Sequence, residues 1–487
     1  MEVAQRLKQL SKDTLFYGLG AALQGSVVLL LFPVYTRLLS QEAFGIQDLV
    51  ASAVTILIYL LALGLDSGAA RYYYDVSRPA DKSAVLSTWL WFELLVSIPI
   101  CIALMGFAEP ICAWTFRNRA LAPFLRLGVA SIPFFLTTKI ATMTLRLTFR
   151  AKKFTFLAAL GAFAEILTAI VLVAVLRLGL QGVFLTMLIA STIHMLVGLG
   201  LTYQHFRPVF SRTLLRAMLA FGVPLVPASL SLWVLNYSNR YFLTRLGTLS
   251  DIALLSVAIR FSAVVSLLNA AFQYAWPPFA YSLLTDTRLA KQTYSRVLTS
   301  YLLITLSVTV ALAVFAREML LILAPSAYQP SARLVPWLCY STIAWGAAGI
   351  VGIGFEIAKK SYHFTIATIL GAATTTVLNI LLIPRWGTTA AAAATMLGNV
   401  VALCYCYSLG QHYFRVDYEA RKVLTTVTLA TLIVAAALLV DRLCPVWGTE
   451  ILLYKTLLGP LFLGGLLLLR VVEPSRLSRR RCGSGNP

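Results

Sequence analysis

The sequence has little charge for its length, and little of that charge is negative. Only 12% of its 487 residues are charged, with 19 Asp and Glu against 40 Lys and Arg, whereas soluble domains carry about 25% charged residues. The four histidines are scattered, and the seven cysteines mostly lie inside apolar runs. No spacing suits a metal site or a thiol-redox motif. We therefore exclude a soluble protein and expect no metal and no cofactor.

The sequence also lacks the motifs of catalysis. It contains no phosphate-binding loop, no nucleophile with an adjacent base and no paired carboxylates on a hydrophilic loop. The connections between apolar runs are short, the longest being about 20 residues, so that no loop could fold as a separate domain. We expect a protein that is not an enzyme and that acts within its apolar segments.

Long apolar runs dominate the sequence. Hydrophobic residues make up 59% of it, and the mean hydropathy is +0.82. Because a spanning helix needs about twenty apolar residues, windows of that size predict an all-α polytopic membrane protein of about fourteen transmembrane helices. The predicted helices cover residues 14–36, 46–66, 84–107, 120–145, 154–176, 180–203, 217–243, 250–273, 294–316, 332–355, 361–383, 387–409, 422–440 and 450–470.

The basic surplus amounts to a formal net charge of +21. In a soluble protein this charge would suggest a nucleic-acid partner, but Lys and Arg gather in the cytoplasmic loops of membrane proteins. Of the 40 basic residues, 26 fall in the two ends and the loops on one side of the predicted bundle, and 12 fall on the other side. This bias predicts a cytoplasmic amino terminus (1–13), a basic cytoplasmic tail (471–487) and no nucleic-acid partner.

Short motifs recur along the chain at a nearly constant offset of about six helices. An even number of helices returns the chain to the same side of the membrane, so the repeat predicts two parallel six-helix lobes related by an axis along the membrane normal. The lobes would cover residues 14–209 and 210–415, with two additional helices at 416–470. The recurring motifs are Ala151-Lys152-Lys153 with Ala358-Lys359-Lys360, Arg177-Leu178-Gly179 with Arg385-Trp386-Gly387, and Thr186-Met187-Leu188 with Thr395-Met396-Leu397.

Four ionisable residues fall inside predicted helices, namely Arg260, Glu93, Lys139 and Glu165. A charge in hydrocarbon costs several kcal/mol unless it faces a cavity or a partner. None of the four has a charged counterpart at the repeat offset, which favours a functional role. We predict that Arg260 and Lys139 line the substrate path. Glu93 and Glu165 would either couple an ion or pair structurally with Lys139.

The seventh predicted helix carries Gly222, Pro224 and Pro227 in its first half. Proline removes a backbone hydrogen bond, and broken helices in membrane transporters usually border a cavity. A proline kink that serves packing alone stays open as the alternative. Asn236 and Asn239 make the far part of the same helix unusually polar, which suggests a surface that faces the path.

Arg71 and Arg240 lie near the ends of predicted helices. Snorkelling towards the lipid headgroups would explain both positions. Three tyrosines follow Arg71 directly; such a run is typical of an interfacial aromatic belt, and it could also flank an opening for a sugar or a phosphate.

Three segments resemble the bacterial polysaccharide-repeat-unit flippases of the multidrug/oligosaccharidyl-lipid/polysaccharide exporter superfamily. They are Phe16–Gly45 with its Ser40-Gln41-Glu42-Ala43-Phe44 sequence, Gly64–Tyr74, and Phe221–Phe242. The resemblance covers at least the first twelve predicted helices. The family often has Asp-Arg where this chain has Asn239-Arg240, so the cation is kept and its neighbouring acid is lost.

The resemblance implies a transporter that flips undecaprenyl-diphosphate-linked oligosaccharide repeat units from the cytoplasmic to the periplasmic leaflet of the bacterial inner membrane. It implies alternating access around a cationic central cavity, and it adds weight to Arg71 and Arg240. The implied partners are the lipid-linked cargo, a polysaccharide polymerase and chain-length machinery, with the chain itself a functional monomer. The alternatives are a multidrug or cation exporter, a lipid II flippase, and a membrane-embedded polysaccharide polymerase or transferase.

Overall fold

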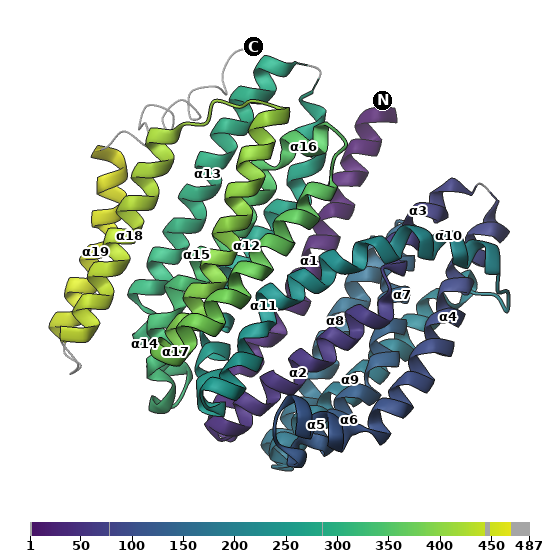
Figure 1. Cartoon of the computed structure of the whole chain (residues 1–487). Helices are drawn as coiled ribbons and strands as arrows, with labels where there is room; N and C mark the ends of the chain where they lie inside the picture. Colours follow the sequence, from purple (N-terminus) through teal and green to yellow (C-terminus); the bar gives the residue numbers. More distant parts are fainter. Residues whose placement is uncertain (1, 77, 285, 444–448, 469–487) are drawn as a thin grey trace. The chain divides into compact units, whose positions relative to one another are not determined.

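The computed structural model describes residues 2–76, 78–284, 286–443 and 449–468 (Figure 1). About 90% of the chain is helical, and no strand occurs in these residues. The predicted all-α class is thereby confirmed. Twelve stretches of the described residues are long and apolar enough to cross a membrane, so the protein is a multi-pass membrane protein. The count of fourteen stays a prediction.

The helices up to residue 246 form a series of long and short segments. The α-helices are α1 (Glu2–Leu38), α2 (Gln41–Ala62), α3 (Leu65–Asp75), α4 (Pro79–Gly106), α5 (Ala108–Thr115), α6 (Ala122–Ala130), α7 (Ile132–Leu147), α8 (Ala151–Ala169), α9 (Gly179–Thr202), α10 (Arg212–Gly222) and α11 (Val226–Leu246). The shorter turns are η1 (Arg119–Leu121), η2 (Ile170–Val175), η3 (Tyr203–His205) and η4 (Val223–Leu225).

The remaining helices lie after residue 246. They are α12 (Leu249–Ser282), α13 (Thr287–Val314), α14 (Ala316–Leu323), η5 (Ser326–Leu334), α15 (Val335–Val351), α16 (Ile353–Ile357), α17 (Tyr362–Tyr413), α18 (Ala420–Leu443) and α19 (Thr449–Leu468). At 52 residues, α17 is too long for one crossing of a bilayer about 30 Å thick. Gly387 has non-helical backbone angles (φ 53°, ψ −131°) and divides α17 into two arms.

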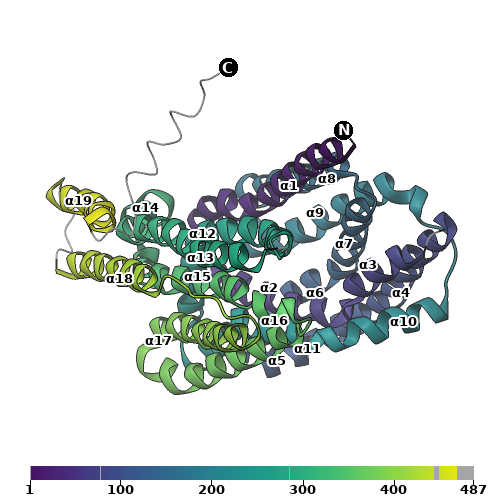
Figure 2. The same ribbon diagram turned by 90° about the horizontal axis from the view of Figure 1, so that it is seen from above.

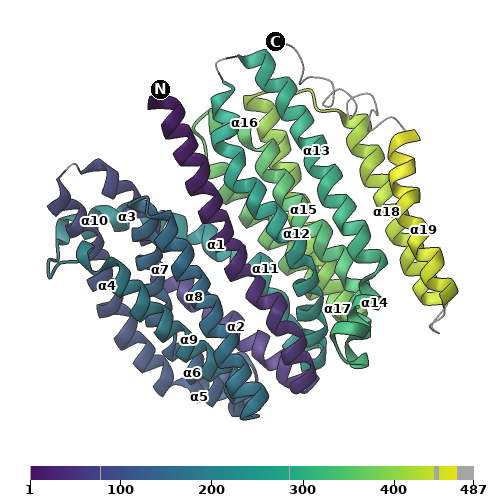
Figure 3. The same cartoon turned by 180° about the vertical axis from the view of Figure 1, so that it is seen from behind.

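The chain forms two compact units. The first contains the described residues of Met1–Ser256, Leu323–Pro325 and Thr376–Ala391, and the second contains those of Val257–Ile322, Ser326–Thr375 and Ala392–Pro487. In the first unit, α8 packs between α1 and α9, α7 packs on α4 and α9, and α3 packs on α10. The view from behind shows α7, α8 and α9 as neighbouring rods (Figure 3).

In the second unit, α13 packs on α15 and α18, and α19 packs on α18 and α13. Figure 2 shows α18 and α19 side by side at the edge of this unit. Lys455 of α19 is fully buried, and its Nζ lies 2.7 Å from a carboxylate oxygen of Glu318 and 2.7 Å from one of Asp441. This cluster ties α19 to α14 and α18.

The sequence repeat has a counterpart in the backbone. Gly179 and Gly387, which share a motif, adopt left-handed angles with φ of 55° and 53°. A left-handed residue also occurs close to each Lys-Lys motif, three residues before Lys152 at Phe149 (φ 55°) and within the second motif at Lys359 (φ 58°). The lobes at 14–209 and 210–415 stay a prediction, and the first compact unit includes α10 and α11.

The turn between α2 and α3 places Asp66 within a candidate membrane span rather than at its end. Ser40 caps α2, and its hydroxyl accepts a hydrogen bond from the backbone N–H of Ala43 at 3.2 Å. Leu63 (φ 47°) and Gly64 (φ 68°) then form a left-handed turn, after which the chain continues as α3. Together α2 and α3 form one candidate span, Gln41–Asp75. The predicted helix, 46–66, was too short at both ends.

Candidate functional site

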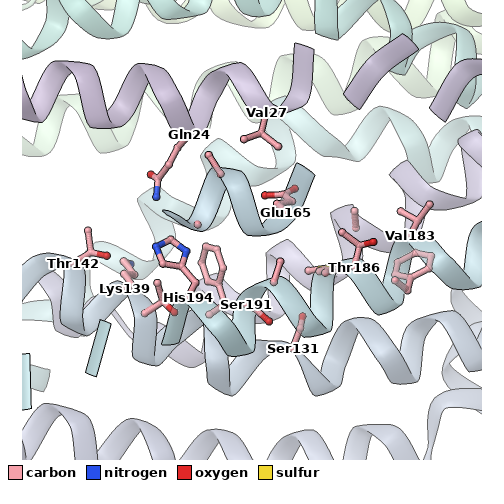
Figure 4. Close-up of a pocket in the computed structure, with 18 of the residues that line it drawn as sticks. Gln24, Val27, Ser131, Lys139, Thr142, Glu165, Val183, Thr186, Ser191 and His194 are labelled. Carbon is pink, nitrogen blue, oxygen red and sulfur yellow. The ribbon is translucent and has the colours of Figure 1, made fainter. Parts of the chain in front are cut away.

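The first unit encloses a cavity of about 630 Å³ whose lining combines charged and polar side chains (Figure 4). Its charged members are Asp66 of α3, Lys139 and Arg146 of α7, and Glu165 of α8, and α9 adds His194. The polar members without charge are Gln24, Tyr35, Gln47, Ser131, Thr138, Thr142, Thr186 and Ser191. Charged side chains inside membrane bundles are costly, and they commonly mark the pathway of a substrate or an ion.

Lys139 and Asp66 form an ion pair in the wall of this cavity. The distance from Lys139 Nζ to Asp66 Oδ2 is 2.9 Å, and the two side chains are 35% and 32% exposed. The sequence left structural pairing of Lys139 with Glu93 or Glu165 open as one alternative, and the ion pair in the structure is with Asp66. Asp66 takes this place because the turn at Gly64 carries the chain on into α3, within the span rather than at its end.

Glu165 and His194 contribute to the same cavity from neighbouring helices. Glu165 is an exposed residue of α8, and no ion pair of Glu165 occurs within the part of the chain that the structure describes. The ring of His194 lies against α8 at Gly161, where a Cβ atom would come within 2.5 Å of it. In Figure 4, the side chains of Lys139, His194 and Glu165 all border the pocket. Gly161 thus leaves the space that the imidazole occupies.

Glu93 lies apart from the cavity lining. Its side chain on α4 is only 3% exposed, and its Oε1 accepts a hydrogen bond of 3.2 Å from the indole N–H of Trp89. Its Oε2 has no hydrogen-bond partner among the described residues. Lys139 and Asp66 are near enough to act on Glu93 electrostatically. Glu93 is therefore a buried neighbour of the ion pair, without a direct contact to the cavity.

Arg240 is held in a buried cluster elsewhere in the first unit. It forms a very short ion pair with Asp48 of α2, and the Arg240 side chain is 3% exposed. Its Nη1 donates to the Asn236 carbonyl at 2.8 Å and to Asn239 Oδ1 at 3.1 Å. The guanidinium also lies over the ring of Tyr237, 4.9 Å from its centroid. The guanidinium is thus held by an ion pair, two hydrogen bonds and an aromatic ring, and Arg240 is not among the residues that line the cavity.

The seventh predicted helix is broken at the residues singled out from the sequence. Helix α10 ends at Gly222, Pro224 lies in the turn η4, and Pro227 lies in the first turn of α11. Gly222 also permits close packing, since a Cβ atom there would lie 2.6 Å from the carbonyl oxygen of Gly64. The break therefore coincides with a contact between α10 and the α2–α3 turn.

The last two predicted cations lie outside the cavity lining. Arg71 is an exposed residue of α3, and its guanidinium lies 5.0 Å from the ring centroid of Phe221. Arg260 belongs to the second unit, where it is 9% exposed and near enough to Tyr328 to act on it electrostatically. Of the four predicted cations, only Lys139 lines the cavity of the first unit.

Five charged or polar residues of the cavity were not predicted from the sequence, namely Asp66, Arg146, His194, Gln24 and Gln47. Asp66 and Arg146 fall at the ends of the predicted helices 46–66 and 120–145, where charge is ordinary. Had the span been extended through the Gly64 turn, Asp66 would have counted as a buried charge. For His194, a lone histidine in an apolar run carried no signal.

Solved structures of similar fold are membrane transporters. A lipid II flippase, MurJ, in an inward closed conformation aligns with a TM-score of 0.71 and 15% identity, covering 93% of this chain and 96% of its own. An outward-facing multidrug resistance MATE family transporter of the MOP superfamily aligns at 0.63 with 17% identity, covering 83% and 95%. The Vibrio cholerae MATE transporter VcmN in its bent form aligns at 0.58 with 14% identity, covering 84% and 97%.

The chain thus shares its fold with a lipid II flippase and with MATE family transporters. Residues 34–333 match the profile of a family described as polysaccharide biosynthesis protein. Because this match covers more than half of the chain, the chain belongs to that family. No curated protein matches the chain. The resemblance of the sequence to a family of polysaccharide biosynthesis is confirmed by this match.

Proposed function

We propose that the protein flips undecaprenyl-diphosphate-linked oligosaccharide repeat units from the cytoplasmic to the periplasmic leaflet of a bacterial inner membrane by alternating access. The observation that carries this proposal is the cavity with Lys139 and Arg146 inside a membrane bundle of the polysaccharide biosynthesis family. The substrate stays chemically unchanged throughout, since none of its bonds is made or broken.

The cargo that we propose is an anion. A lipid-linked diphosphate diester carries about two negative charges, which hydrocarbon does not solvate. Ammonium and guanidinium groups can replace the lost water as partners of the phosphate oxygens. Of the proposed path cations Arg260, Arg240, Arg71 and Lys139, we assign the direct phosphate contact to Lys139, because it lines the cavity. In this proposal Arg240 has a structural role, as the buried partner of Asp48.

We also propose a membrane topology for the chain and partners for it. The bias of Lys and Arg towards one side of the predicted bundle supports cytoplasmic termini. The cargo would be handed over to a polysaccharide polymerase with its chain-length machinery, and a single chain would suffice for flipping. Glu93 and Glu165 are kept as candidates for ion coupling, Glu165 with direct access to the cavity.

Lys139→Met tests the proposal. It should be produced in a strain that lacks its own repeat-unit flippase, and surface polysaccharide should be measured together with the lipid-linked units left in the cytoplasmic leaflet. We expect surface polysaccharide to fall at least about tenfold, with units accumulating inside. The matched control, Lys422→Met, removes a lysine from an ion pair of similar exposure outside the cavity. Wild-type polysaccharide in Lys139→Met would refute the role of Lys139.

Lipid II is the second candidate cargo. The lipid II flippase aligns over 93% of this chain, ten percentage points more than the outward-facing multidrug transporter does. Lipid II carries the same diphosphate linkage, so the same cation would serve it. The two cargoes separate in one assay, in which the protein is tested for rescue of a strain depleted of its lipid II flippase. Export of organic cations is less well supported, because the two carboxylates of the cavity, Asp66 and Glu165, are balanced by Lys139 and Arg146.

A further inference from the structure

Two ion pairs of the first unit differ in how accessible they are. The pair of Arg240 and Asp48 is buried, with side chains 3% and 19% exposed. The side chains of Lys139 and Asp66 are each about one-third exposed, and both residues line the cavity. A buried pair is a fixed structural element, whereas an accessible pair with one contact between its members can open when a competing ion arrives.

A carrier of anions meets a second problem after it has released its cargo. The binding cation must then return through the bundle empty, and an uncompensated ammonium in an apolar surrounding costs several kcal/mol. The carboxylate of Asp66, 2.9 Å from the ammonium of Lys139, removes this cost. The charge of Lys139 is thus balanced within the protein itself.

We propose that Asp66 is an exchangeable counter-ion: the diphosphate of the cargo displaces it from Lys139, and it returns to Lys139 when the cavity empties. This inference rests on the proposed function, because it requires an anionic cargo at Lys139. Loaded and empty carriers then both present a neutralised lysine. Asp66 thereby competes with the cargo for the lysine, so that cargo affinity is moderated while the empty carrier can return.

The other carboxylates near the pair are less suited to this exchange. Glu93 is 3% exposed and held by the indole of Trp89, so it has no water-filled space in which to move. Glu165 lines the cavity, and no ion pair between Glu165 and Lys139 occurs in the described part of the chain. Asp66 alone among these three is both bonded to the lysine and open to the cavity.

The test measures binding of a short-chain probe, farnesyl diphosphate linked to N-acetylglucosamine, to the purified full-length protein by isothermal titration calorimetry. Because Asp66→Asn removes the competitor, we expect its Kd to be about two- to fivefold lower than that of the wild type. Flipping of the same probe in liposomes should nevertheless slow, because the empty carrier now returns with a bare lysine. Asp66→Glu, which keeps the competing carboxylate, should bind like the wild type.

A control variant separates competition at Lys139 from a general change of charge. Glu109→Gln removes a carboxylate and breaks its pair with Arg126 away from the cavity. We expect it to bind the probe within about twofold of the wild type. If Glu109→Gln tightens binding as much as Asp66→Asn does, or if Asp66→Asn binds no tighter than the wild type, the exchange is refuted.

A measurement on the wild-type protein covers the case in which Asp66→Asn fails to fold. Asp66 is labelled with a carbodiimide and glycine ethyl ester, with and without the probe, and followed by peptide mass spectrometry. Exchange predicts faster labelling of Asp66 when the probe is bound, whereas a fixed pair predicts equal or slower labelling. Absence of probe binding would count against the proposed function, and binding without faster labelling of Asp66 would count against the exchange alone.

Discussion

Asp48 of α2 supplies the carboxylate that neutralises Arg240 of α11, across 192 positions of sequence. In the resembled family an acid often precedes this arginine directly, and here that position is Asn239. The amide oxygen of Asn239 accepts one hydrogen bond from the guanidinium, and the charge is balanced from another helix. The charge of Arg240 is thus balanced by an acid that is distant in the sequence.

Asp48→Asn should destabilise the protein strongly, because it leaves the buried guanidinium of Arg240 without a counter-charge. We expect the free energy of unfolding to fall by about 3–5 kcal/mol, measured by thermal unfolding in detergent. The double variant Asp48→Asn with Arg240→Met removes both charges and should recover much of that loss. Equal stability of Asp48→Asn and the wild type would show that the pair is not a structural element.

Lys455→Met should loosen the attachment of α19 within the second unit. The substitution leaves the carboxylates of Glu318 and Asp441, 11% and 15% exposed, without their shared cation. We expect a loss of about 3–5 kcal/mol in the free energy of unfolding, seen in the same unfolding measurement. Lys422→Met serves as the control, because its pair with Glu419 is about one-third exposed and is worth at most about 1 kcal/mol. Similar losses in both variants would contradict the distinction.

Gly68→Ala should push α3 away from α10. A Cβ atom at this position would lie 2.6 Å from the carbonyl oxygen of Met218, which is backbone and cannot rotate away. We expect a destabilisation of about 1–3 kcal/mol from overpacking, measured by urea unfolding. Gly106→Ala offers the matched control, since no heavy atom lies within 4 Å of its Cβ position. A loss in the control as large as in Gly68→Ala would rule out the close contact as the cause.

Arg260→Ala should abolish surface polysaccharide while protein level and membrane insertion stay unchanged, if Arg260 lines the transport path as proposed. Immunoblotting of membranes and gel analysis of surface polysaccharide check the two parts of this outcome. Arg415→Ala removes an arginine whose side chain is 84% exposed and should leave polysaccharide intact. Normal polysaccharide in Arg260→Ala would remove this residue from the path.

The helical class and membrane location followed from composition, because only lipid can solvate apolar runs of this number and length. The break at Gly222 and Pro224 was also predictable, since it depends on the local chemistry of glycine and proline. Lys139 could be singled out because a lysine inside an apolar run needs a partner or a cavity. These conclusions depend on short-range properties of the sequence.

The partners of the buried charges were decided only by tertiary structure. From the sequence, Glu93 and Glu165 were the candidate partners of Lys139, because Asp66 fell at the end of a predicted helix. In the structure, two left-handed residues carry the chain from α2 on into α3, and Asp66 lies beside Lys139. Arg240 and Asp48 are likewise brought together only by tertiary structure, through the packing of α11 on α2. Composition determines that a charge in the membrane must be compensated; which residue compensates it depends on distances between helices that no local pattern contains.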